Sequence, residues 1–412
     1  MLKIKLSSIL LFALVIPFIM TFRLGSGETP YWQFGLVFLF LTAYLSLDVL
    51  KLNKSKKELF KNLLLGTVVL LTVVSGFGAS LVVRHQGSPL YGVHDIILQQ
   101  EAAMRFLLDG KNPYEQNYFG TFLEQWHYSD SEVNPALYHF VMMPFYLIFS
   151  LPFYWVAFRT VGFFDGRMPL LFLYLASLGL AFLLLKKKGE LRRQLVILLA
   201  FNPATLAYLL EGRSDFFVFG FLFLSLFLLF KSRNLLSALV LGLAFAVKQS
   251  VWPVFPFYFA YIYFKNKDIK KLFKPLLGFS LSFGAVVLPF FFWGPKFFWQ
   301  DTFSYLSGKA EHSYPIAGYG WGMVLNQFGF IKDLSAYYPF AIWQLVFCLP
   351  LLVVLLYFLS KKPTIWKLIF CYGIFTLVFW YFSRYFHNSH LGFLSTIFIM
   401  AYYFEQAGVK KR

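Results

Sequence analysis

The sequence has few charges and few cysteines, and each shortage excludes a class of protein. Charged residues make up only 14% of the 412 residues, whereas a soluble domain carries about 25%. No part of the chain therefore looks like a separate soluble domain. Only two cysteines occur, Cys348 and Cys371, both inside apolar runs, so no disulfide framework or zinc site is predicted. Neither a GxxxxGKS/T loop nor a GxGxxG element is present, which leaves ATP-driven pumping without support.

Apolar and aromatic residues are abundant instead. Hydrophobic residues make up 59% of the chain, with 55 Phe and 25 Tyr, and the mean hydropathy is +0.64. Several apolar runs reach the roughly 18 residues that cross the hydrocarbon core of a bilayer. The Phe and Tyr content is typical of lipid-facing helices and interfacial belts. The sequence therefore predicts an all-α polytopic membrane protein, one transmembrane domain over residues 1–412 that is surrounded by membrane lipids.

The net charge of +18 would suggest a nucleic-acid partner in a soluble protein. Here, however, the positive residues gather in short loops, and such loops face the cytoplasm. We therefore expect no nucleic-acid partner, a location in the inner or plasma membrane, and both termini in the cytoplasm. The positive clusters lie at residues 51–61, 186–193, 231–233, 265–274, 361–367 and 410–412.

The apolar runs between these clusters predict about twelve transmembrane helices, with 13 or 14 as the alternative. The first run resembles a signal peptide, but no small-residue cleavage site is evident and a second run follows at once, so we expect it to be the first helix. The expected spans lie near residues 6–22, 31–50, 62–83, 168–185, 194–211, 215–230, 235–248, 250–264, 275–293, 336–359, 365–382 and 391–406.

The apolar segment 136–158 does not fit a topology in which all the basic clusters lie on the cytoplasmic side. A single crossing there would place the basic loop 186–193 outside, against the positive-inside rule. We therefore expect a re-entrant or broken hairpin with Pro144 and Pro152 as breakers, and a spanning hairpin is the alternative.

Two long external loops are expected, at residues 84–135 and 294–335. The first is too long for a simple connector, and such loops are usually functional. Residues 95–109 within it predict an amphipathic helix on the membrane surface. Asp95 begins this helix, and Gln99 falls one turn later on the same face. Asp95 is then either the N-cap of the helix, a functional carboxylate, or both.

A second polar set interrupts two spans at their outer ends. Glu211, Arg213 and Asp215 lie within five residues. They form either a polar turn with an internal ion pair or a ligand site, because charges there are costly unless water or a ligand reaches them. Lys248 and Gln249 join two short expected helices, and a lysine at membrane depth normally faces a cavity or a partner.

A third polar set lies near the C-terminus. Arg384, His387 and His390 fall on one face of a helix, with Tyr385 beside them. Such a donor cluster suits a phosphate, for which arginine is the best bidentate partner. The two histidines could also ligate a metal, although no carboxylate lies close to them in sequence. The loop that carries His312 is either an ordinary aromatic interfacial loop or a gate over a pocket.

His94 and Asp95, the surface helix and the motif LDGKNPY at 108–114 resemble the first external loop of the GT-C superfamily. These are membrane glycosyltransferases that use lipid-phosphate-linked sugars. The segment 138–152, the polar turn 211–215 and the motif AFAVK at 244–248 are similar to elements of the family-87 polyprenol-phosphate mannosyltransferases. The likeness covers most of the chain by order of elements. It departs from the family at Arg213, where glutamine is more usual.

The resemblance implies a GT-C-like fold and an inverting transfer of a sugar, with mannose favoured, from a polyprenyl-phosphate donor to a lipid or glycan acceptor. The site would face the external or periplasmic side. Asp95 would be the general base, and Lys248, Arg384, His387 and His390 would bind the donor phosphate. The expected substrate-binding residues are His94, Gln99, Glu211, Arg213, Asp215, Gln249, His312 and Tyr385.

No cofactor is expected for this reaction, and metal dependence is left open. The alternative function is a secondary transporter or flippase for a lipid-linked or polar solute. A transporter needs polar residues in both halves of the membrane, whereas the polar sets here gather on one side. The sequence also shows no inverted repeat of broken helices.

Overall fold

The computed structural model describes residues 4–21, 31–127 and 133–409. Its regular structure in these ranges is almost entirely helical, which confirms the all-α prediction. Two short strands, β1 (Ala317–Gly318) and β2 (Tyr385–Phe386), pair in parallel. The helices of the N-terminal half are α1 (Leu6–Thr21), α2 (Tyr31–Val49), α3 (Lys54–Val69), η1 (Leu70–Val74), α4 (Ser75–Gln86), α5 (Asp95–Leu108), η2 (Phe122–Gln125), η3 (Pro135–Leu137), α6 (Phe145–Thr160), α7 (Met168–Leu184), α8 (Gly189–Ala200) and α9 (Pro203–Glu211). Those of the C-terminal half are α10 (Asp215–Phe230), α11 (Asn234–Phe245), η4 (Gln249–Val254), α12 (Phe255–Asn266), α13 (Lys270–Trp293), α14 (Pro295–Trp299), η5 (Gln300–Ser304), α15 (Tyr305–Ser307), α16 (Trp321–Gln327), α17 (Phe340–Lys361), α18 (Ile365–Tyr381) and α19 (Asn388–Gly408).

Among the described residues, four helices are long and apolar enough to cross a membrane. They are α2, α13, α17 and the continuous run Lys54–Gln86, which joins α3, η1 and α4. The pair α8 and α9 adds a fifth candidate that bends by 50° at its break. Each remaining expected span also coincides with helix, and all of these helices except α19 are shorter. The helices and their apolar surfaces indicate a membrane protein.

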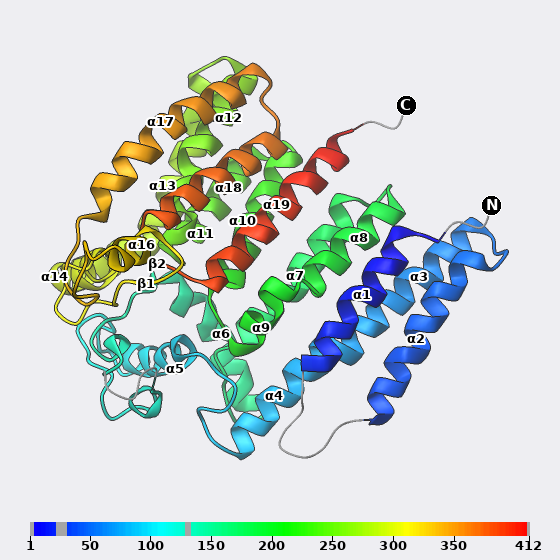
Figure 1. Cartoon of the computed structure of the whole chain (residues 1–412), viewed down its shortest axis with the longest axis horizontal. Coiled ribbons are helices and arrows are strands. Elements are labelled where there is room, and N and C mark those ends of the chain that lie inside the picture. The colour runs from blue at the N-terminus through cyan, green and yellow to red at the C-terminus, as the bar shows by residue number, and fades with distance from the viewer. Residues whose placement is uncertain (1–3, 22–30, 128–132, 410–412) are drawn as a thin grey trace.

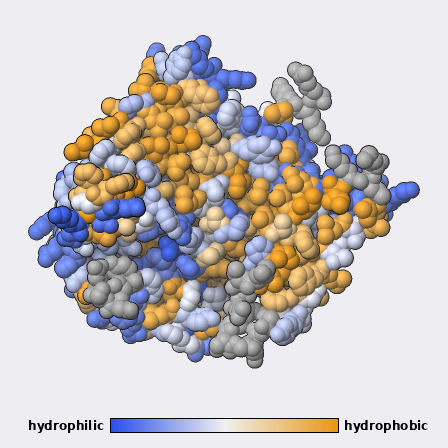
Figure 2. Space-filling model, viewed as in Figure 1, coloured by the Kyte–Doolittle hydropathy of each residue, from blue (hydrophilic) through white to orange (hydrophobic). Residues whose placement is uncertain are grey.

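The bundle helices run side by side and expose apolar side chains along their length. On α17, Ile342, Leu345 and Val353 are each largely exposed, and so are Phe273 and Phe292 on α13. Figure 2 shows hydrophobic side chains over broad areas of one face of the molecule. Soluble monomers rarely expose apolar patches of more than a few hundred Å². These helices therefore present the surface that a bilayer would cover.

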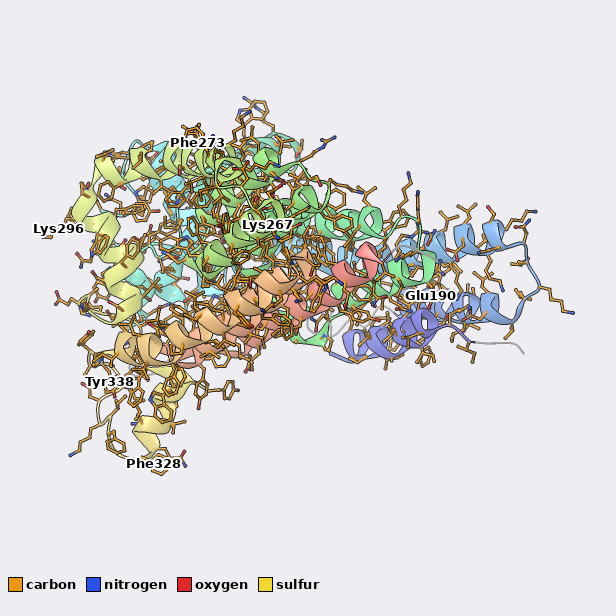
Figure 3. The ribbon with its side chains drawn as sticks, turned by 90° about the horizontal axis from the view of Figure 1, so that it is seen from above. Glu190, Lys267, Phe273, Lys296, Phe328 and Tyr338 are labelled. Atoms are coloured by element: carbon orange, nitrogen blue, oxygen red, sulfur yellow. The ribbon has the colours of Figure 1, made fainter. Side chains whose placement is uncertain are left out.

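The connections between helices gather at two ends of the molecule (Figure 1). One end, here called the basic end, holds the α2–α3 and α7–α8 connections and the end of α19. Its parts are in contact: the guanidinium of Arg193 lies 2.5 Å from the Glu58 carboxylate, and Lys188 donates to the carbonyl of Val409 at 2.7 Å. The opposite end, the loop end, holds α5, α14, α16 and the two strands. Figure 3 shows the same separation, with Glu190 and Lys296 at opposite ends.

The chain between η3 and α7 leaves the loop end and returns to it. Asn134 lies beside Asp95 at 3.4 Å, and the amide of Phe145 then donates to the carbonyl of Ala246, beyond the last residue of α11. The helix α6 carries the chain back, so that Asp165 accepts from Arg84 at 2.7 Å. Relative to the bundle, this segment enters and leaves at the same end.

Only one of the two expected breakers lies at a helix boundary in this segment. The helix α6 begins directly after Pro144, whereas Pro152 lies inside it. A proline inside a helix removes one backbone hydrogen bond and can kink the helix without ending it. Phe149 and Phe153, on either side of Pro152, pack at steep angles against aromatic rings of α10 and α7. The expected break at Pro152 was therefore wrong, because α6 continues through it.

Candidate functional site

A cavity of about 1380 Å³ opens at the loop end. Its wall comes from the start of α5, the α9–α10 turn, the α11–η4 break, η5 and the start of α19, so segments far apart in sequence meet there. The cavity is lined by all but one of the residues singled out from the sequence: His94, Asp95, Gln99, Glu211, Arg213, Asp215, Lys248, Gln249, Arg384, Tyr385, His387 and His390.

The exception is His312, which lies outside the cavity wall. Its side chain is 48% exposed and its ring stacks on Tyr138, with 3.9 Å between the ring centroids. The placement of His312 among the substrate-binding residues is therefore not supported. Its neighbour Tyr314 does line the cavity.

The carboxylate of Asp95 lies at the first turn of α5. His94, not Asp95, occupies the N-cap position of the helix. The two Asp95 oxygens have different partners, and the amide of Ile96 also stabilises the carboxylate. One lies 2.5 Å from Nδ1 of His94, and the other accepts from Asn134 at 3.4 Å. Asp95 is the first residue of α5 and not its N-cap, so the N-cap alternative was wrong.

The surroundings of Asp95 favour its ionised form. Burial by itself raises the pKa of this carboxyl, but His94 and Asn134 stabilise the carboxylate more strongly. The net result is that the pKa of Asp95 lies below its ordinary value. Asp95 is therefore an anion at neutral pH, as a general base must be.

Gln99 holds the wall of the cavity together. Its amide nitrogen donates to the carbonyls of Ala136 at 2.6 Å and His139 at 2.7 Å. Both donors of the amide are used by the backbone of the segment that precedes α6. Gln99 therefore positions that segment against α5.

The turn between α9 and α10 packs directly on α5. Gly212 has a φ of +91°, and a Cβ at this position would clash with Ile97. Only glycine adopts this conformation without strain and leaves room for that contact. The amide of His94 donates to the carbonyl of Glu211 at 2.8 Å. Gly212 thus brings the polar turn up to the start of α5, where Asp95 lies.

Arg213 projects from this turn with most of its donors unused. Its Nε lies 3.4 Å from a Glu211 oxygen, and its guanidinium lies 4.8 Å from the centroid of the Tyr208 ring. Within the described ranges, its two terminal nitrogens have no hydrogen-bond partner. Arg213 therefore keeps a two-pronged donor face for a ligand.

Lys248 is already paired. Its ammonium donates to Asp215 at 2.8 Å and to Ser214 at 3.0 Å. The lysine lies in extended backbone between α11 and η4, a break that turns it toward the start of α10. Next to it, the amide of Gln249 donates to the carbonyls of Val141 and Thr302. Both residues line the cavity while they tie its walls together.

Arg384 is 3% exposed and is occupied by backbone carbonyls. Its guanidinium donates to Ala336 at 2.8 Å, to Ser335 at 2.9 Å and to Leu334 at 3.3 Å, and its Nε donates to Tyr314. Arg384 therefore holds the loop before α17 in place. These bonds leave few donors of the guanidinium for a phosphate, contrary to the role expected from the sequence.

The two histidines form the cap of α19. Nδ1 of His390 accepts from the amide of His387 at 3.0 Å, and the His387 ring accepts from the amide of His390. Burial lowers the pKa of His387, and the nearby cations Arg213 and His94 lower it further, so the ring is neutral. Since one ring nitrogen accepts, the other, Nε2, carries the proton. This buried Nε2 has no hydrogen-bond partner among the described residues.

A buried pair at the cavity wall, His139 and Asp301, was not predicted from the sequence. Nδ1 of His139 lies 2.8 Å from Asp301, and Nε2 lies 2.7 Å from the carbonyl of Glu311. The pKa of His139 is raised, because the bonds to Asp301 and Glu311 outweigh the effect of burial. The only signal in the sequence was that His139 and Asp301 are each ionisable residues within an aromatic-rich segment. An ionisable residue in such a segment often has a partner.

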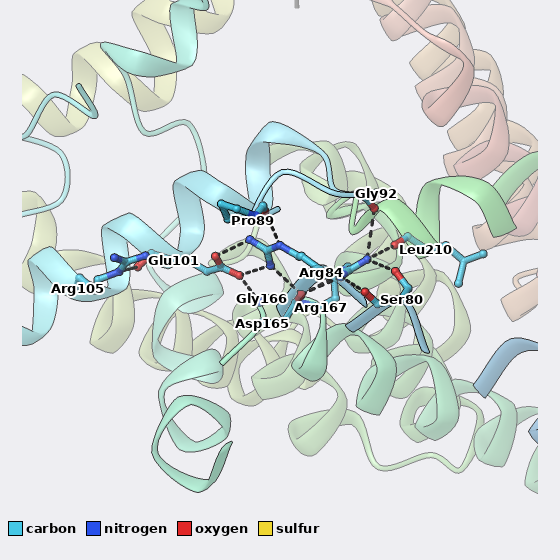
Figure 4. A network of polar contacts seen from close by, with 10 residues as sticks. All are labelled: Ser80, Arg84, Pro89, Gly92, Glu101, Arg105, Asp165, Gly166, Arg167 and Leu210. Carbon is cyan, nitrogen blue, oxygen red and sulfur yellow. Dashed lines mark hydrogen bonds and ion pairs between the residues drawn. The ribbon is translucent and has the colours of Figure 1, made fainter. Parts of the chain in front are cut away.

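A second missed cluster supports the cavity from behind (Figure 4). Arg84 lies 2.7 Å from both Glu101 and Asp165, and so joins α4, α5 and the connection before α7. Arg167, fully buried, pairs with Asp165 and donates to the carbonyls of Gly92 and Leu210. Those carbonyls belong to the two chain segments that carry Asp95 and Arg213.

No protein-family model, curated protein or solved structure matches this chain. In the part of the chain that the structure describes, no three His, Cys, Asp or Glu side chains lie close enough together to hold a metal ion.

Proposed function

We propose that this protein is an inverting glycosyltransferase of the membrane. It would move a sugar, with mannose the first candidate, from a polyprenyl-phosphate donor to a lipid or glycan acceptor. One observation carries the proposal: an ionised carboxylate, Asp95, and an arginine with unused donors, Arg213, line the same cavity. The resemblance of the first external loop to that of GT-C enzymes supports it, whereas Arg213 is the point at which the polar turn departs from the family.

The reaction needs one base and one anion site. The Asp95 carboxylate takes the proton of the acceptor hydroxyl as the hydroxyl oxygen bonds to the anomeric carbon of the sugar. The bond from that carbon to the phosphate oxygen breaks, and the polyprenyl phosphate leaves with the electron pair. The sugar carries oxocarbenium character at this point, as in glycoside hydrolysis. A single displacement inverts the configuration at the anomeric carbon.

The leaving phosphate requires cationic donors that are not already used. Lys248 and Arg384 are engaged within the protein, by Asp215 and by backbone carbonyls respectively. Arg213 offers two free nitrogens and His387 offers Nε2–H, and the two are close enough for Arg213 to lower the pKa of His387. We assign the phosphate to Arg213 and His387, with Lys248 as a more distant charge.

The size and placement of the cavity agree with this assignment. A volume of about 1380 Å³ exceeds the roughly 300–1,000 Å³ of a common ligand pocket. Such a volume accommodates a donor sugar phosphate together with an acceptor. The polar lining lies at the loop end, opposite the basic end, and by the positive-inside rule the loop end would face outward. A transporter or flippase would need polar lining in both halves of the bundle.

The test is transfer by the purified protein in lipid nanodiscs, supplied with several polyprenyl-phosphate sugars and membrane-lipid acceptors. Wild-type protein should form product of inverted anomeric configuration. Asp95→Asn should abolish transfer and Asp109→Asn, an exposed carboxylate at the other end of α5, should not. Turnover by Asp95→Asn at the wild-type rate would exclude the assigned base.

A further inference from the structure

The loop between β1 and α17 contains a projection with its own small core. Residues 321–334, here called the α16 arm, follow β1 and consist of α16 and the turn after it. Leu325 and Ile331 of the arm are buried with Ile316 and Phe340, apart from the main core of the bundle. The arm is therefore a defined unit rather than an extended loop.

The tip of the arm carries two exposed phenylalanines. Phe328 is 72% exposed and Phe330 is 76% exposed, and Gly329 between them has a φ of +77°. The turn is closed by the side chain of Asn326, which donates to the carbonyl of Ile331 at 2.8 Å. The fold thus holds both rings out of the small core, although apolar side chains of that size are normally buried.

The direction of the arm shows what these rings would meet. In Figure 3, Phe328 lies at the tip of a projection that leaves the side of the bundle beside Tyr338, near the start of α17. The arm therefore extends sideways from the helices rather than onward from the loop end. The first turns of α17 expose Ile342 and Leu345, which continue the apolar surface from the arm onto the bundle.

We propose that the α16 arm is a lipid-binding element that inserts Phe328 and Phe330 into the membrane interface on the cavity side. Aromatic side chains are enriched at that depth of the bilayer. Lys332, exposed beside the two rings, suits the phosphate groups of lipids. This inference does not depend on the reaction proposed above, because it concerns only the surface that the arm contacts.

The arm is also connected to the cavity. Arg384 donates to the carbonyl of Leu334, the last residue of the arm, and to that of Tyr314, which lines the cavity. The parallel pair β1–β2 places the start of the arm beside Tyr385 of the cavity wall. Contact of the arm with lipid would therefore hold the cavity wall at a set height relative to the membrane surface.

The experiment is nitroxide labelling of the full chain in nanodiscs of phosphatidylcholine and phosphatidylglycerol, with Cys348 and Cys371 replaced by alanine. Single cysteines at Phe328 and Phe330 report collisions with oxygen, which enters lipid, and with a nickel chelate, which stays in water. The controls are Leu345, 66% exposed on α17, and Glu311, whose side chain is 85% exposed in a polar loop.

Labels at 328 and 330 should give an oxygen-to-nickel ratio equal to that at 345 and severalfold above that at 311. Oxygen-to-nickel ratios at 328 and 330 equal to the ratio at 311 would overturn the proposal. An arm that stays in water to bind a protein partner would give this result. A label at Met323, which is partly buried against the small core of the arm, verifies folding, since its mobility should stay low in every sample.

Discussion

Nδ1 of His94 lies 2.5 Å from Oδ1 of Asp95, at the point where α5 begins. The backbone amide of the same histidine donates to the carbonyl of Glu211 in the facing turn. One residue therefore sets the position of the proposed base, its ionisation and its distance from Arg213. This relationship makes the acid side of the pH profile a direct test of the site.

His94→Asn should move the acid limb of kcat/KM to higher pH. Asparagine retains the N-cap but removes the group that lowers the pKa of Asp95. The pKa of Asp95 in the wild type lies below the ordinary aspartate value of about 3.9. The wild type should therefore lose activity only at a pH below that ordinary value. In the variant, His94 no longer offsets burial, so the pKa of Asp95 should rise above that of the wild type. An unchanged acid limb, measured from pH 4 to 8, would contradict this.

Arg213→Gln should lower the rate of transfer by roughly 10²–10³-fold, the usual cost of removing one donor to a developing charge. The loss should appear in kcat, because the phosphate gains charge as it leaves. Arg105→Gln, which removes an exposed arginine of α5, is the matched control and should leave the rate unchanged. Equal rates for the two variants in the nanodisc assay would remove Arg213 from the anion site.

Arg384→Gln should act on the loop and not directly on the chemistry. Each hydrogen bond from a charged donor contributes about 1.5–3 kcal/mol, and this guanidinium serves four carbonyls. Its loss should release the segment before α17, and trypsin should then cut after Lys309 and Lys332. Arg213→Gln serves as the control, since it should keep the protection of the wild type. Protection of the Arg384→Gln variant would place Arg384 in substrate binding instead.

Arg84→Met should destabilise the protein by about 3–5 kcal/mol, because Glu101 loses its buried cation and Asp165 loses one of two. Thermal unfolding in detergent, followed with a dye that reports newly exposed thiols, is the measurement. Arg105→Met is a surface change and should stay within about 0.5 kcal/mol. A midpoint for Arg84→Met equal to that of the control would mean that the network of Figure 4 contributes no net stability.

Local patterns in the sequence predicted the helices well. The runs near 31–50 and 365–382 became α2 and α18 within two residues, and the amphipathic pattern at 95–109 became α5. Apolar length and periodicity depend only on neighbouring residues, so they are visible before folding. The two prolines expected as breakers in 136–158 show the limit of such patterns. Pro144 directly precedes α6, but Pro152 lies inside it, where Phe149 and Phe153 contact aromatic rings of distant helices.

The candidate site was only partly visible. The loop charges predicted that the polar sets lie on one side of the membrane. In the structure, twelve of the selected residues line one cavity. What each of them does there was decided by partners far away in sequence. Arg384 is occupied by carbonyls some fifty to seventy residues earlier in the chain, and His139 by Asp301, 162 residues later.

The sequence by itself therefore determined that the chain is helical and largely apolar, and that its polar sets lie on one side. Each of these properties depends on the residue types in a segment and not on contacts between distant segments. Only the tertiary structure decided which cations remain free. A buried charge must be compensated by whatever group the fold brings to it, and that group is not predictable from its neighbours in the chain. By this criterion Arg384 and Lys248 are engaged within the fold, whereas Arg213 still faces the cavity with unused donors.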